Sequence, residues 1–222
     1  MIEITCDKLF GSVPPYLERL FNSTKYPWEV LKNIDSYIKE IQQECLQNGF
    51  IEISKGILIG QNTKIATTAT IIAPTIIGHE SEVRHGAFIR GDVITGIGCV
   101  IGNSCEIKNS VILDHAQIPH FNYVGDSIIG NYAHLGAGAI CSNLKSDKSL
   151  IIVKSKPEIE TGLKKLGAVL GDHVEVGCGC VLNPGTIICN NSRVYPLMSI
   201  RGVIPRDSIM KSADNIVPII NK

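Results

Sequence analysis

Large apolar residues recur every six positions through most of this chain. The pattern starts near residue 59, pauses after residue 113 and returns in phase at residue 170. A small residue stands four positions after many of them, as at Ala69, Ala87 and Cys105. The large positions are Ile59, Ile65, Ile71, Ile77, Val83, Ile89, Ile101, Ile107, Leu113, Leu170, Val176, Leu182, Ile188, Val194 and Ile200, with Thr95 as the one exception.

A period of six fits neither an α-helix nor an ordinary alternating strand. Three such units make one triangular coil of parallel strands, with the large residue inside and small residues near the corners. Coils of this kind stack about 4.8 Å apart, and each satisfies the backbone groups of the next. The pattern therefore predicts a mainly β protein built as a parallel β-helix.

Two stretches break the pattern. From Pro119 the segments PHFNY and VGDSI predict five-residue turns, after which Ile129 and Leu135 resume the period. Residues 144–167 do not follow the period at all and carry six lysines against three acids. An insertion of this length is expected to reach a ligand or a neighbouring subunit.

The first 54 residues follow a different period. Val30, Leu31, Ile34, Ile38 and Ile41 recur at helical spacing, which predicts an amphipathic helix over the end of the main domain, or one that contacts a neighbouring subunit. The predicted organisation is a helical cap (1–54), the β-helix (55–208) and a short tail (209–222).

Composition narrows the classes of function. The chain is 44% hydrophobic but only 5% aromatic, which suits thin layers of Ile, Val and Ala. Its 21 basic and 21 acidic residues leave no net charge to attract nucleic acid. No run is long enough to span a membrane and no signal peptide is recognisable, so a cytoplasmic location is expected. The eight cysteines lack paired C-x2-C spacing, so no metal site is expected, and without a secretion signal we expect reduced thiols.

Three side chains suggest chemistry. Arg90 and Lys108 each follow an inward isoleucine and lie 18 residues, or one coil, apart. Cations stacked about 5 Å apart repel each other unless an anion such as phosphate lies near them, although two solvated surface cations are the alternative. His120 lies two-thirds of a coil beyond Lys108. An imidazole titrates near about pH 6.5, which suits a general base.

The order of these residues resembles the acetyltransferase domain of the bifunctional glucosamine-1-phosphate acetyltransferase and N-acetylglucosamine-1-phosphate uridylyltransferase. The segments EIKNS, YVGDS and TGLKKLGA are also similar to archaeal and clostridial-type sugar-1-phosphate nucleotidylyltransferase-related proteins. The resemblance covers roughly residues 55–210. The residues that carry it are Arg90, Lys108, His120, Tyr123, Ala137 and Asn143.

This resemblance implies a left-handed coil, a homotrimer with sites between subunits, and N-acetylation of a hexosamine 1-phosphate by acetyl-CoA in nucleotide-sugar and cell-envelope precursor synthesis. It makes His120 the general base, which takes a proton from the sugar's ammonium group.

The resemblance assigns the other positions to the two substrates. Arg90 and Lys108 would hold the phosphate with Tyr123 beside it, and Asn143 would orient the sugar or the acetyl group. Lys148 is the nearest match to a further phosphate-binding lysine. Ala137 and Cys178 would line the acetyl-CoA channel, with a backbone N–H near Ala137 stabilising the oxyanion.

This sequence also departs from the family. His134 stands where the family has a sugar-contacting asparagine, so it would affect the choice of amino sugar. The expected uridylyltransferase domain is not represented in the chain.

Two other functions remain open. His79, His115 and His120 have a spacing like the zinc ligands of γ-class carbonic anhydrases, and a non-catalytic subunit that binds a sugar phosphate is also possible.

Overall fold

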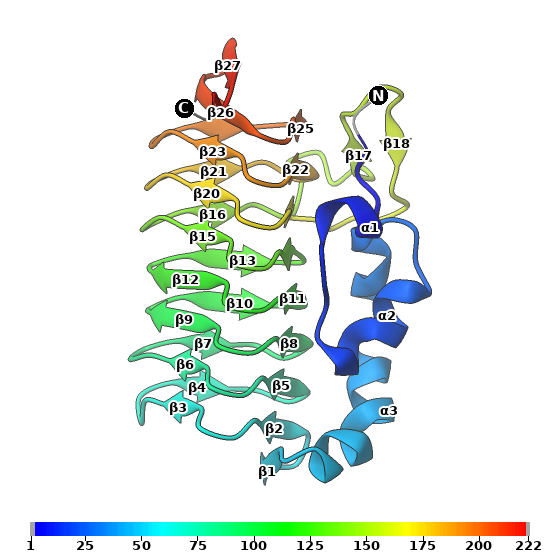
Figure 1. Cartoon of the computed structure of the whole chain (residues 1–222), viewed down its shortest axis with the longest axis vertical. Helices are drawn as coiled ribbons and strands as arrows, with labels where there is room; N and C mark the ends of the chain where they lie inside the picture. Colours follow the sequence, from blue (N-terminus) through cyan, green and yellow to red (C-terminus); the bar gives the residue numbers. More distant parts are fainter. Residues whose placement is uncertain (1–2, 221–222) are drawn as a thin grey trace.

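The computed structural model describes residues 3–220 and confirms a left-handed parallel β-helix (Figure 1). Short strands run in turn along three faces of a triangular prism, and strands of successive coils pair in parallel, whereas β1 and β27 add antiparallel pairs at the ends. We name the faces A, B and C in the order in which the chain first follows them. The corners are named by the two faces that meet there.

The strands are short on every face. Face A contains β1 (Ile51–Ser54), β2 (Ile57–Ile59), β5 (Thr75–Ile77), β8 (Val93–Thr95), β11 (Ser110–Ile112), β14 (Ile128–Ile129), β19 (Ala168–Leu170), β22 (Thr186–Ile188) and β25 (Val203–Ile204). Face B contains β3 (Lys64–Ile65), β6 (Glu82–Val83), β9 (Val100–Asn103), β12 (Gln117–His120), β15 (His134–Leu135), β20 (Glu175–Val176), β23 (Arg193–Val194), β26 (Ser208–Ser212) and β27 (Asn215–Pro218). Face C contains β4 (Thr70–Ile71), β7 (Phe88–Ile89), β10 (Glu106–Lys108), β13 (Tyr123–Gly125), β16 (Ile140–Cys141), β21 (Val181–Leu182) and β24 (Ser199–Ile200).

The interior of the prism is a single column of apolar side chains. Ile89, Ile107 and Leu182 are fully buried in it, as the six-residue period predicts. Thr95 takes one inward position, and its hydroxyl oxygen accepts a hydrogen bond from the Gly78 N–H at 2.9 Å. Cys105 and Cys180 fill positions beside the corners, where small residues are needed. The periodic pattern therefore corresponds to the inner wall of the coil.

The shortened turns are not where the sequence placed them. The inward residue after Ile107 is Ile112, which pairs with Thr95 and Ile129, whereas Leu113 faces outward under the N-terminal helices. The five-residue steps are therefore 107–112 and 124–129, both at the C–A corner. The step 118–124, which holds His120, has the full six residues. The prediction that His120 lies in a shortened turn was wrong.

The N-terminal segment lies along face A and not over an end of the prism (Figure 1). Helix α3 contacts both β2 and β8. The outward residues Leu58, Ile76, Ile94 and Val111 of face A are fully buried beneath the segment. Its elements are α1 (Cys6–Leu9), a 3-10 turn η1 (Pro15–Leu17), α2 (Glu18–Asn22), a 3-10 turn η2 (Pro27–Lys32) and α3 (Ile34–Gln47).

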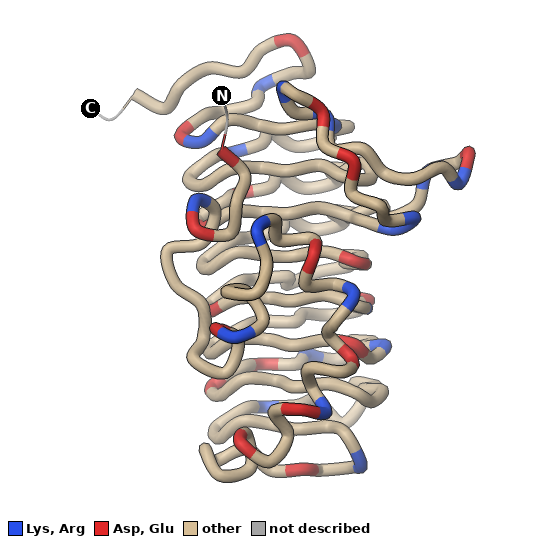
Figure 2. Tube along the Cα trace, turned by 90° about the vertical axis from the view of Figure 1, so that its right-hand side faces the viewer, with Lys and Arg blue, Asp and Glu red and all other residues tan. Residues whose placement is uncertain are grey.

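The insertion at 144–167 also folds back onto the N-terminal side. The chain leaves the coil at Asn143, whose carbonyl accepts from the Leu166 N–H at 3.0 Å where the coil resumes. A small antiparallel hairpin, β17 (Ile152–Val153) and β18 (Ile159–Glu160), forms inside it. Ile151 and Val153 are buried in the same cluster as the N-terminal helices. Residues 146–150 of the insertion are exposed, and a charged loop projects from the side of the prism (Figure 2).

The C-terminal residues close the C-terminal end of the coil. Strand β26 pairs in parallel with β23, and β27 then returns antiparallel to β26, so the segment expected to be a tail forms a hairpin. Within residues 3–220, no helix combines the length and the apolar character needed to cross a membrane.

Candidate active site

Face C carries the two cations that the sequence singles out. Arg90 directly follows β7, and Lys108 ends β10 on the next coil. The Arg90 N–H donates to the Ile107 carbonyl at 2.8 Å, so the two cations are neighbours across the strands. Because Ile89 and Ile107 point inward, the residues that follow them face outward.

Each cation is already paired with a carboxylate of the protein. Arg90 Nη1 lies 2.6 Å from Glu106 Oε1, and this contact raises the pKa of the guanidinium. Lys108 Nζ lies 3.4 Å from Asp126 Oδ2. The predicted repulsion between the stacked cations is therefore offset by two carboxylates. A phosphate here would join a cluster whose formal charges balance.

Asp126 is the centre of this cluster, and its side chain is only 6% exposed. Besides Lys108, it accepts hydrogen bonds from Asn109 Nδ2 at 2.8 Å and from Asn143 Nδ2. Asn143 Nδ2 also lies 3.2 Å from the hydroxyl oxygen of Tyr123. The structure thus brings together Lys108, Tyr123 and Asn143, three of the residues that the sequence proposed for substrate binding.

Our sequence reasoning missed both carboxylates, although signals for them were present. Glu106 stands two positions before Lys108, and alternate residues of a strand share a face. Asp126 follows Asn109 by 17 residues, which is one coil with a shortened turn. Locating that turn correctly would have placed Asp126 beside the lysine.

His120 stands at the B–C corner, on the other edge of face C. Gly138 N–H donates to the His120 carbonyl at 3.0 Å, and Gly179 N–H donates to the Ala137 carbonyl at 2.8 Å. His120, Ala137 and Cys178 therefore occupy equivalent positions on three successive coils. The His120 and Cys178 side chains are exposed, and Ala137 is half-buried.

A buried asparagine holds this corner. Asn122 is 3% exposed, and its Oδ1 accepts a hydrogen bond from the His120 N–H at 3.0 Å. Its Nδ2 donates to the carbonyl oxygen of Gly136 at 2.8 Å and to that of Ala139 at 3.3 Å, both on the next coil. Asn122 thus fixes the backbone from which the His120 side chain extends, a role that the sequence did not reveal.

The histidine and the cation cluster lie at opposite edges of one face. Gly125 is the register partner of Lys108. Gly125 comes five positions after His120, a distance of at most about 17 Å at about 3.3 Å per residue. Tyr123, at the start of β13, lies between them. A ligand that contacts both edges must therefore cross face C over Tyr123.

Two further predicted residues are not part of this cluster within one chain. His134 lies on face B, where its Nδ1 is 2.9 Å from Glu175 Oε2. Lys148 is exposed in the insertion, where its N–H donates to the Lys145 carbonyl at 3.0 Å.

The three histidines of the zinc alternative are also separated. His79 lies at the A–B corner, where its Nδ1 accepts from the Gln61 N–H at 2.8 Å and its ring packs against Phe50. His115 stacks on Tyr132 at the same corner, whereas His120 is at the B–C corner. Within residues 3–220, no three His, Cys, Asp or Glu side chains are grouped as metal ligands would be. A single chain therefore does not assemble the zinc site.

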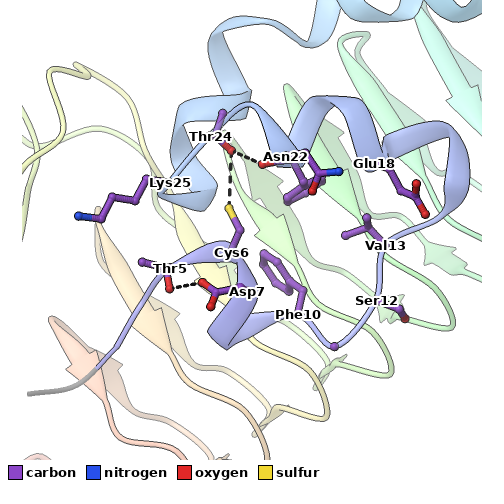
Figure 3. Close-up of a pocket in the computed structure, with 12 residues that line it drawn as sticks. Thr5, Cys6, Asp7, Phe10, Ser12, Val13, Glu18, Asn22, Thr24 and Lys25 are labelled. Atoms are coloured by element: carbon purple, nitrogen blue, oxygen red, sulfur yellow. Dashed lines mark hydrogen bonds between the residues drawn. The ribbon is translucent and has the colours of Figure 1, made fainter.

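A pocket of about 590 Å³ lies in the N-terminal segment, away from face C (Figure 3). The Cys6 thiol lies 3.6 Å from the Thr24 hydroxyl, which donates to the Phe21 carbonyl. Burial raises the pKa of the Cys6 thiol, which makes it a poor nucleophile. The candidate chemistry therefore remains on face C.

The fold and these side chains define a hexapeptide-repeat β-helix protein with a polar site on one face. The chain belongs to the GMPPB C-terminal domain family, whose model matches residues 71–204.

Among curated proteins, the chain is 32% identical over 204 residues to the bifunctional protein GlmU of Methanococcus maripaludis. The alignment covers 90% of this chain and 49% of that protein. It is 42% identical over 97 residues to a bifunctional sugar-1-phosphate nucleotidylyltransferase/acetyltransferase of Sulfurisphaera tokodaii, covering 43% of this chain and 24% of that protein. The chain thus spans about half the length of the GlmU relatives.

Among solved structures, a hexapeptide transferase family protein from Anaplasma phagocytophilum aligns with a TM-score of 0.40 at 14% identity, covering 76% of this chain and 87% of that one. The acetyltransferase domain of PglB from Neisseria gonorrhoeae, in complex with acetyl coenzyme A, aligns with a TM-score of 0.27 at 13% identity, covering 84% and 66%. At these identities the similarity concerns the fold alone.

Proposed function

We propose that this chain is an acetyl-CoA-dependent N-acetyltransferase that acts on a hexosamine 1-phosphate in nucleotide-sugar and cell-envelope precursor synthesis. The observation that carries the proposal is the distribution of groups across face C. Two cations, a phenol and an amide lie together, and an exposed imidazole stands at the opposite edge. The names of the relatives, GlmU and sugar-1-phosphate nucleotidylyltransferase/acetyltransferase, support this chemistry.

The phosphate would bind at Arg90 and Lys108, where the guanidinium offers two parallel donors and the ammonium a point charge. The sugar would then extend over Tyr123 towards His120, with Asn143 orienting it. The two cations already have carboxylate partners, Glu106 and Asp126. We therefore expect phosphate binding to depend on where these carboxylates lie as well as on the charge of the cations.

His120 would act as the general base at the other edge. It takes a proton from the sugar's ammonium group, and the freed amine attacks the thioester carbonyl carbon of acetyl-CoA. A C–N bond forms, the C–S bond breaks, the nitrogen loses its second proton to leave a neutral amide, and the CoA thiolate takes up one proton and leaves as a thiol. The Ala137 N–H makes no hydrogen bond within residues 3–220, so it is available to the oxyanion that develops. Cys178, on the next coil, would line the path of acetyl-CoA.

We also propose a homotrimer with its sites between subunits. The N-terminal segment covers face A, which leaves faces B and C for subunit contacts. His134 and Lys148 would then reach a site on face C from a neighbouring copy. Light scattering is expected to give the mass of a trimer, and a monomer at micromolar concentration would contradict this assembly.

The test of the function is thiol release from acetyl-CoA with glucosamine, galactosamine and their 1-phosphates as acceptors. We expect release with at least one 1-phosphate and little with the unphosphorylated sugars. Calorimetric binding of a sugar 1-phosphate without any thiol release would identify a non-catalytic binding subunit instead.

A further inference from the structure

The cluster around Asp126 determines which atoms its neighbours can offer to a ligand. A carboxylate paired with a lysine accepts hydrogen bonds and donates none. The amide nitrogens of Asn109 and Asn143, and not their oxygens, must therefore face Asp126, as they do here. The orientation of both amides follows from this chemistry and needs no other assumption.

Both hydrogens of the Asn143 amide group are used inside the protein. One is donated to Asp126 Oδ2, and the other points to the Tyr123 hydroxyl oxygen at 3.2 Å. Within residues 3–220, Asn143 Oδ1 makes no hydrogen bond, and the residue is only half-buried. Asn143 therefore offers an acceptor to a ligand and has no donor left.

Tyr123 has the opposite polarity. Its hydroxyl oxygen accepts from Asn143, so its own hydrogen is free for an acceptor outside the cluster. Burial is the main cause that raises the pKa of Tyr123, so the phenol keeps its proton at neutral pH.

A glycine lets the phenol reach this position. A Cβ at Gly125 would lie 2.5 Å from the Tyr123 hydroxyl oxygen, so only glycine leaves room for the ring there. Gly125 is also the register partner of Lys108. The free O–H of Tyr123 therefore lies on the coil that follows the one containing Lys108.

We propose that Asp126 is a positioning residue that fixes the polarity of the substrate site, with Asn143 as an acceptor and Tyr123 as a donor. The identity of the ligand rests on the proposed function, but the polarity does not. With a hexosamine 1-phosphate, Tyr123 would donate to a phosphate oxygen near Lys108. Asn143 would accept from a sugar hydroxyl or ammonium group, and it would not stabilise an oxyanion.

The polarity can be measured without a substrate, by NMR of protein labelled with ¹⁵N in its asparagines. We expect both side-chain amide protons of Asn143 to exchange slowly with water. Asp126→Asn should make both protons exchange rapidly, and Tyr123→Phe should make one of the two exchange rapidly. The control is Asp207→Asn, which alters a matched 2.8 Å hydrogen bond from Asn191 Nδ2 at the A–B corner, outside this cluster. Rapid exchange in the unaltered protein would overturn the proposal.

Kinetics then test the consequence for the substrate. Asp126→Asn should raise the KM for the sugar phosphate about tenfold or more and change that for acetyl-CoA less than about twofold, because charged hydrogen bonds are being disrupted. Asp207→Asn, the control outside the cluster, should change neither KM. Tyr123→Phe alone should raise the KM for the sugar phosphate. Combined with Asp126→Asn, it should raise that KM by less than about twofold more, because both residues act through one network.

The outcomes separate the two claims. If the double variant of Asp126→Asn and Tyr123→Phe raised the KM for the sugar phosphate by the product of the two single effects, the positioning role of Asp126 would be overturned. Slow amide exchange combined with no acetyl transfer to any sugar phosphate would refute the proposed function and leave the polarity intact.

Discussion

Replacing Arg90 by glutamine tests the phosphate site most sharply, because the chain supplies a matched control. Arg84 follows an inward valine on face B as Arg90 follows an inward isoleucine on face C. Arg84 Nη2 pairs with Glu82 Oε2 at 3.1 Å, and its side chain is 35% exposed against 44% for Arg90. Exposed ion pairs are typically worth about 0–1 kcal/mol, so neither substitution should unfold the protein.

The size of the effect follows from the contacts of Arg90. Losing one charge-assisted hydrogen bond to phosphate costs about 1.5–3 kcal/mol, or roughly ten- to hundredfold in KM. Arg90→Gln also leaves Glu106 without its partner, and repulsion between two charges about 4 Å apart adds about 1 kcal/mol even in water. We therefore expect an increase near hundredfold for the sugar phosphate. The double variant Arg90→Gln with Glu106→Gln should recover part of it.

The assay is thiol release, with each substrate varied while the other is saturating. Arg84→Gln should leave both KM values within about twofold, because Arg84 pairs with Glu82 and is not among the residues assigned to the phosphate. Equal effects of Arg84→Gln and Arg90→Gln would refute the phosphate site. So would equal increases in the KM values for the sugar phosphate and acetyl-CoA.

Three further predictions concern stability, metal and substrate choice. Ile41→Ala removes a fully buried side chain of α3 and should lower the free energy of unfolding by about 2–5 kcal/mol in urea titrations, whereas the exposed Lys39→Ala should change it by about 1 kcal/mol or less. Dialysis against a chelator should leave turnover unchanged, and a loss restored by zinc would favour metal chemistry. His134→Ala should alter the preference among amino sugars more than the turnover number, and a general loss of turnover would contradict its assigned role.

The sequence predicted the coil because its period is repeated many times. Inward residues such as Ile89 and Leu182 are set by steric fit, and each repeat confirms the others. One shortened turn was enough to mislead the alignment: Leu113 was assigned to the interior, where Ile112 lies, because both are large and apolar. Periodicity alone cannot choose between two adjacent apolar residues.

The position of the N-terminal segment was missed for a related reason. Face A strands carry apolar residues at consecutive positions, as at Ile76 and Ile77, and both are fully buried. Such runs indicate a sheet that is covered on both sides. Only the inward residue was used in our prediction, so the segment was placed over an end.

Within the site, repeat spacing correctly predicted that Arg90 and Lys108 are neighbours. Their carboxylate partners Glu106 and Asp126, and the buried Asn122 that supports His120, depend on side-chain directions at the corners. Those directions follow from turn lengths and left-handed backbone positions, such as that of Asp126 at φ +49°, which a single sequence does not display.

The central claim is that His120 takes a proton from the amine of a hexosamine 1-phosphate. The most direct measurement compares thiol release from acetyl-CoA by the unaltered protein, His120→Ala and His115→Ala, with the sugar 1-phosphate that the unaltered protein uses best. His115 is the control, since it stacks on Tyr132 at 4.8 Å at the corner opposite face C. We expect His120→Ala to lose about 10²–10⁴-fold in turnover while acetyl-CoA binding persists, and His115→Ala to stay near the unaltered rate. Full turnover by His120→Ala would contradict the account.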